Sequence, residues 1–63
     1  MNRFQLEFNG IKAIVTHSTN NNVPVTCVAI SFGGSWYGSA FGGHVHGGDL
    51  EGYILGISQR VTA

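Results

Sequence analysis

Apolar and polar side chains alternate from Asn2 to Phe8, which is the period of a β-strand with one buried face. Asn9-Gly10 follows, a dipeptide that favours a two-residue type I′ hairpin turn because both residues tolerate a positive φ. Residues 11–17 are again rich in strand-forming side chains. A two-residue loop sets the register of such a hairpin, and here it predicts the cross-strand pairs Phe8–Ile11, Glu7–Lys12, Leu6–Ala13 and Phe4–Val15.

A second apolar segment, residues 25–32, is apolar on both alternating faces, which is typical of a strand in the centre of a sheet. The polar run at residues 18–22 predicts a loop before it, and Pro24 suits the start of a strand. Gly33-Gly34 predicts another tight turn after it.

Glycine dominates the rest of the chain, at spacings of four in Gly34, Gly38 and Gly42 and again in Gly48, Gly52 and Gly56. Each glycine disfavours a helix by about 1 kcal/mol, so the pattern favours strands. We expect a bent or bulged strand at residues 35–46, with a short helical turn within residues 35–41 as the alternative. A turn at residues 47–49 and a last strand at residues 50–62 would follow, with these side chains on one face: Tyr53, Leu55, Ile57 and Val61.

These elements predict an all-β fold in one domain, residues 1–63. The architecture would be an antiparallel meander of four to five strands, strongly curled or barrel-like. The glycine-rich strands would serve this fold by permitting curvature, by exposing backbone to a contacting partner, or by both.

The chain has 63 residues, one cysteine, and three basic and three acidic side chains, so its formal net charge is zero. One cysteine allows neither an internal disulfide nor a cysteine-based zinc site, which are the usual supports of so small a domain. A neutral chain also lacks the repulsion that keeps molecules apart. We therefore expect a homo-oligomer, formed through the glycine-rich strand.

Charge and hydropathy also exclude several partners. Three scattered cations cannot form the basic face of a nucleic-acid-binding protein. Polar residues and glycines break the longest uncharged stretch, and His44, His46, Asp49 and Glu51 interrupt the glycine-rich half, which argues against a membrane span. A membrane-active peptide would be cationic, whereas this chain is neutral. The sequence begins without a signal-peptide pattern. We expect a cytoplasmic protein that binds neither nucleic acid nor membrane.

No pattern of catalytic residues is present. The sequence has neither a nucleophile-elbow motif nor a phosphate-binding loop that ends in Lys-Ser or Lys-Thr. Cys27 lies within the most apolar strand, so we expect a buried, unreactive thiol. We expect no enzyme and no cofactor.

The pair His44-Val45-His46 is the sharpest chemical feature of the chain, because His at i and i+2 of a strand point from the same face. The spacing Gly38-x5-His44-x-His46-x4-Glu51 resembles the first metal motif of the cupin family. This resemblance implies a β-barrel metal site with His44, His46 and Glu51 as ligands, and His17 is a further candidate. The chain has Ser58 where the motif has glycine, and no second motif follows. We therefore predict no bound metal, with a metal- or small-ligand-binding β-protein as the alternative function.

Aromatic side chains gather in the glycine-rich half of the chain. Seven aromatics in a chain of this length should supply most of its core, but adjacent Trp36 and Tyr37 would face opposite sides of a strand. An exposed aromatic beside glycines is typical of a protein-contact hot spot. The predicted function is a non-enzymatic protein-binding module, such as a phage or mobile-element inhibitor of a host or defence protein. Its predicted partner-binding residues are Trp36, Tyr37, Phe41, His44, His46 and Tyr53.

Overall fold

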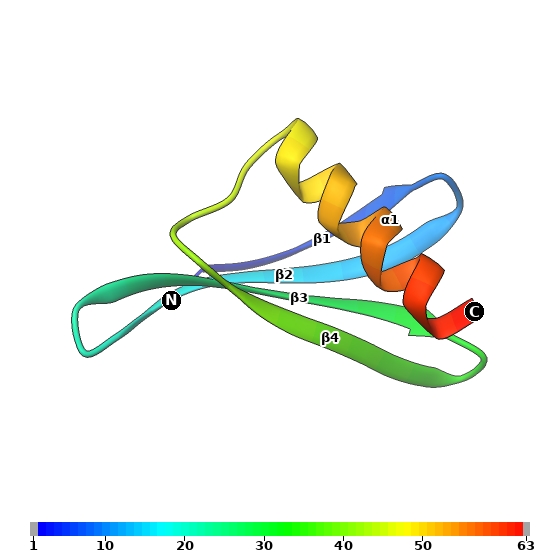
Figure 1. Cartoon of the computed structure of the whole chain (residues 1–63), viewed down its shortest axis with the longest axis horizontal. Helices are drawn as coiled ribbons and strands as arrows, with labels where there is room; N and C mark the ends of the chain where they lie inside the picture. The colour runs from blue at the N-terminus through cyan, green and yellow to red at the C-terminus, as the bar shows by residue number, and fades with distance from the viewer. Residues whose placement is uncertain (1, 63) are drawn as a thin grey trace.

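The computed structural model describes residues 2–62 and contains one sheet and one helix. The antiparallel strands follow one another in the order β1-β2-β3-β4, and α1 lies across one side of the sheet (Figure 1). The bounds of the elements are β1 Asn2–Phe8, β2 Ile11–Asn20, β3 Val23–Phe32, β4 Ser35–Gly42 and α1 Gly48–Thr62. The predicted meander is therefore confirmed for four strands, whereas the sheet is open and does not close into a barrel.

The first hairpin has the predicted register, with Phe8 opposite Ile11 and Phe4 opposite Val15. Asn9 and Gly10 both have positive φ values, 54° and 76°, as a type I′ turn requires. The hairpin between β2 and β3 turns in the same way on Asn21 and Asn22, at 52° and 65°. The loop predicted at residues 18–22 is thus shorter than expected, because asparagine tolerates the left-handed region and lets the strands run to Asn20 and from Val23.

The last strand predicted from the sequence is wrong, because residues 48–62 form α1. Leu50, Ile54 and Ile57 are spaced by four and three, and as a helical stripe they bury one face against the sheet. Acidic side chains in the first turn and Arg60 in the last turn complement the helix dipole. The strand predicted at residues 35–46 also ends early, at Gly42, and a connection to the helix follows.

The prediction that aromatic side chains supply most of the core is wrong, because the buried core is aliphatic. It is formed between the sheet and α1 by Ala13, Val15, Val28, Ile30, Leu50, Ile54 and Ile57. Two large aromatics lie outside it: Tyr37, at the margin of the helix-covered face, is 41% exposed, and Trp36, which points from the opposite face of the sheet, is 52% exposed. One helix is too narrow to cover four strands, so the aromatics on the outer strands stay in partial contact with solvent.

The sheet therefore has two different faces. The helix-covered face carries the core residues of β2 and β3. The other face, here called the uncovered face, has no layer over it within residues 2–62. It carries the alternate residues of each strand, including Arg3 of β1, Ile14 and Thr16 of β2, Cys27 and Ala29 of β3, and Trp36, Gly38 and Ala40 of β4.

Candidate functional site

The connection between β4 and α1, residues 43–47, crosses the helix-covered face at one end of the sheet (Figure 1). We call it the crossover segment. It carries His44 and His46, which therefore do not sit on a strand as predicted. Five hydrogen bonds attach it to β2 and β3, and one of them, from Gly43 N–H to the Pro24 carbonyl, continues the β3–β4 ladder at 2.9 Å.

Thr26, on β3, provides the central attachment of the crossover segment. Its side chain is fully buried, and its hydroxyl donates to the Gly43 carbonyl at 2.7 Å while it accepts from Val45 N–H at 2.9 Å. Both backbone groups are thereby paired without a strand neighbour, as buried backbone requires. Val45 itself packs against the core.

His17, on β2, provides the second attachment and is 8% exposed. Its Nε2 lies 2.8 Å from the Val45 carbonyl oxygen, and because a carbonyl only accepts, this nitrogen carries a hydrogen. The Nε2 of His44 donates in the same way to the Ser18 carbonyl at 3.0 Å. Phe4 meets the His17 ring edge-on, with ring centroids 5.6 Å apart.

The structure brings the three predicted histidines together. The His17 ring centroid lies 5.0 Å from that of His44 and 4.6 Å from that of His46. A five-strand meander would have kept His17 away from the pair, but the crossover segment returns over β2. Two of the three rings nevertheless use Nε2 to hold backbone carbonyls, and Glu51 lies in the first turn of α1. Within residues 2–62, no three His, Cys, Asp or Glu side chains are placed to hold one metal ion.

The predicted aromatic residues do not form one surface. Phe41 and Tyr53 stack on each other at a centroid distance of 3.9 Å, which attaches α1 to β4 on the helix-covered face. Tyr37 lies on that face too and meets Phe32 edge-on. Trp36 alone of these four points from the uncovered face, since it pairs with Ser31 while Tyr37 pairs with buried Ile30.

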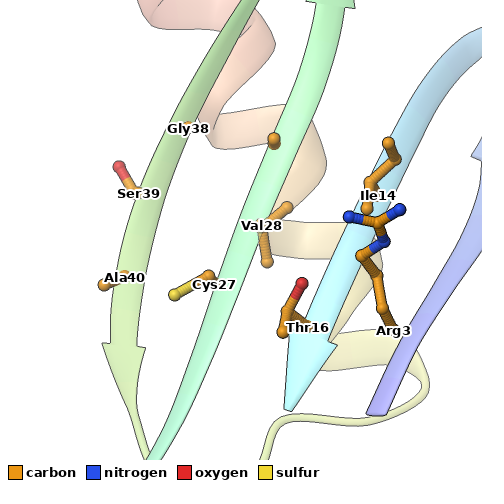
Figure 2. Close-up of a pocket in the computed structure, with 9 residues that line it drawn as sticks. Arg3, Ile14, Thr16, Cys27, Val28, Gly38, Ser39 and Ala40 are labelled. Carbon is orange, nitrogen blue, oxygen red and sulfur yellow. The ribbon is translucent and has the colours of Figure 1, made fainter. Parts of the chain in front are cut away.

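The uncovered face contains an open hollow of about 440 Å³ between β1 and β4. Its floor is made of small residues from β3 and β4, among them Cys27, Gly38 and Ala40 (Figure 2). Ala29 of β3 also lines it. Ile14 and Thr16 rise from β2, and Arg3 extends beside Ile14 from β1. Arg3 is the one charged side chain of the lining.

The prediction of a buried Cys27 thiol is wrong, because this thiol is exposed in the hollow. The segment at residues 25–32 is apolar on both faces, as the sequence showed, but only one of those faces is covered. Thr26 was not predicted as a key residue either. The only sequence signal for it is a polar, β-branched residue at a position where the alternation expects a core side chain.

Comparisons with protein families, with curated proteins and with solved structures find no match to this chain. No helix in the described part of the chain has the length and apolar character needed to cross a membrane.

Proposed function

We propose that this protein is a non-enzymatic module that binds another protein through the uncovered face of its sheet. The observation that carries the proposal is the hollow on that face, with a floor of small uncharged residues and a half-exposed Trp36 on the same face. A half-apolar sheet face is normally packed against a second layer, and within residues 2–62 this one has none. A phage or mobile-element inhibitor of a host or defence protein is one use of such a module.

The chemistry of the hollow defines the partner it suits. Side chains as small as those of Cys27, Ala29 and Ala40 let a partner's backbone or a protruding apolar side chain approach the sheet closely. Arg3 is the single charge of the lining and favours a carboxylate at the edge of the contact. The partner is therefore a protein segment with apolar side chains next to an acidic residue.

The histidine cluster supports an architectural role better than a ligand-binding one. His17 and His44 donate to carbonyls of neighbouring segments, and His17 is nearly buried, so these rings fix the crossover segment to β2. We therefore do not propose the alternative metal site of His44, His46, Glu51 and His17.

Affinity capture from cells of the source organism tests the proposal. The tagged protein should retain a specific protein, and Cys27→Glu, which adds a carboxylate to the floor of the hollow, should abolish its retention. The matched control is Gln59→Glu, which adds the same group to an exposed position on α1. Equal retention by wild type and Cys27→Glu would contradict the proposal.

Cys27 also gives a direct readout on a purified complex. Its exposed thiol should react readily with a maleimide in the free protein, and bound partner should slow that reaction at least tenfold. An unchanged rate in the complex would place the contact elsewhere on the molecule.

A further inference from the structure

Within residues 2–62, the outer strand β4 presents backbone groups without a hydrogen-bond partner along its whole length. The two-residue turn at Gly33-Gly34 joins Phe32 to Ser35, which lie opposite each other. In a hairpin with such a turn, these two residues form both backbone N–H···O=C hydrogen bonds with each other. Hydrogen-bonded pairs recur at every second residue, and the bond from Gly43 N–H to the Pro24 carbonyl confirms this phase at the far end of the strand. The intervening residues aim their N–H and C=O groups away from β3: Trp36, Gly38, Ala40 and Gly42.

The two outer edges of the sheet differ in their protection. The same alternation on β1 directs the backbone of Arg3, Gln5 and Glu7 outward, and two of these carry charges that discourage strand addition. The outward residues of β4 include no charge and no proline, and three of the four are glycine or alanine. β4 is therefore the edge open to another strand.

We propose that two copies of this chain pair antiparallel through β4, about a two-fold axis at Ser39. Such pairing is symmetric by construction and opposes no like charges along the two strands, because residues 35–42 carry none. Only residues that both point outward can exchange hydrogen bonds, which limits the possible registers. With Ser39 opposite Ser39 of the second copy, Trp36 pairs with Gly42 of the second copy, and Gly38 with Ala40 of the second copy.

Side chains favour this register over the two nearest alternatives. On the helix-covered side, the Ser39 register sets Tyr37 opposite Phe41 of the second copy, and the two-fold axis repeats this pair. Aromatic cross-strand pairs stabilise a sheet. On the uncovered side Trp36 covers Gly42 of the second copy, where no side chain competes for the space. A register centred on Gly38 would instead set Tyr37 opposite Ser39 of the second copy and Phe41 opposite Ser35 of the second copy. A register centred on Ala40 would set Tyr37 opposite Gly43 of the second copy and Phe41 opposite Ser39 of the second copy.

The dimer joins the two uncovered faces into one eight-stranded surface and leaves both hollows open, so it goes beyond the proposed function without replacing it. Arg60 donates to the Ser39 hydroxyl at 3.1 Å, so the two-fold axis brings two guanidinium groups to the same region. Added salt screens the repulsion between these two cations, so the dissociation constant of the dimer should fall as the salt concentration rises.

Sedimentation velocity at micromolar concentrations should show a species of twice the 6.7 kDa chain mass. Ala40→Pro removes an outward N–H that has no hydrogen-bond partner among residues 2–62, and should shift the protein to monomer. Gln5→Pro makes the same change on the β1 edge and should remain dimeric. A monomeric wild type, or dissociation by both prolines, would overturn the inference.

A cysteine at the axis tests the register and does not depend on Ala40→Pro folding. In a Cys27→Ser background, Ser39→Cys should form a disulfide-linked dimer under mild oxidation, whereas Ser35→Cys should not. Equal crosslinking by both would refute the Ser39 axis. A monomer that still captures a partner in a Cys27-dependent manner refutes the dimer alone, and a dimer without such capture refutes the proposed function alone.

Discussion

The two glycines inside α1 give the sharpest test of how this chain reaches its fold. A methyl group added at Gly52 or Gly56 would meet nothing within 4 Å, and neither position has a positive φ. Each Gly→Ala change should therefore recover the helix-propensity difference of about 1 kcal/mol without steric cost. Applied together, Gly52→Ala and Gly56→Ala should raise the free energy of unfolding by about 2 kcal/mol.

Thermal unfolding followed by circular dichroism at 222 nm, at one fixed protein concentration, measures this effect. For a chain of this size, 1 kcal/mol corresponds to roughly 4–8 °C, so the double variant should melt about 8–16 °C higher. Urea unfolding should shift its midpoint while the slope stays constant.

The control that separates a helix from a strand is Gly56→Val. In a helix, valine stabilises less than alanine because its branched side chain loses rotamer freedom, whereas in a strand it stabilises more. We expect Gly56→Ala to be more stable than Gly56→Val. The reverse order, or a loss of stability in both alanine variants, would contradict a helix at residues 48–62.

Three further predictions concern the sheet and its attachment. Thr26→Val should lower stability by about 2–3 kcal/mol in urea unfolding, because it leaves the Gly43 carbonyl and Val45 N–H unpaired, while Thr26→Ser should retain most of it. Gly38→Ala should cost about 1–3 kcal/mol in the same assay, because its Cβ would lie 2.8 Å from the Val28 carbonyl oxygen. Gly10→Val should cost about 1 kcal/mol or more by thermal unfolding, since a β-branched residue resists the φ of +76° found there.

The first hairpin was predictable because two local signals agree. The alternation of residues 2–8 and the turn at Asn9-Gly10 each specify the same register, and no distant residue is needed to choose it. The helix was not predictable in this way, because its glycines oppose it locally. Burial of Leu50, Ile54 and Ile57 stabilises it by roughly 1.5–3 kcal/mol each, which exceeds the roughly 1 kcal/mol that each glycine costs. That burial exists only once the sheet is present.

For the candidate site as well, the sequence predicted residues but not their arrangement in space. The sequence identified His17, His44 and His46, but their meeting depends on the path of the crossover segment over the sheet. Cys27 is exposed because the single helix covers the other face of the sheet and no second layer covers the face of Cys27 within residues 2–62. The alternation of the strands predicts which residues share a face, and only the tertiary structure decides which face is covered.

The path of the crossover segment explains why its anchors are polar. It leaves β4 with a turn at Gly43, where φ is 83°, passes over β3 and β2, and turns again at Gly47, where φ is 59°, to enter α1. Residues 44–46 lie between these two turns and outside the sheet, so no ladder hydrogen bonds pair their backbone groups, and side chains of the sheet pair with those of Val45 instead. Thr26 and His17 do this from the helix-covered face, so His17 holds the path of the chain between the sheet and α1, whereas the proposed binding surfaces are the uncovered face and the β4 edge.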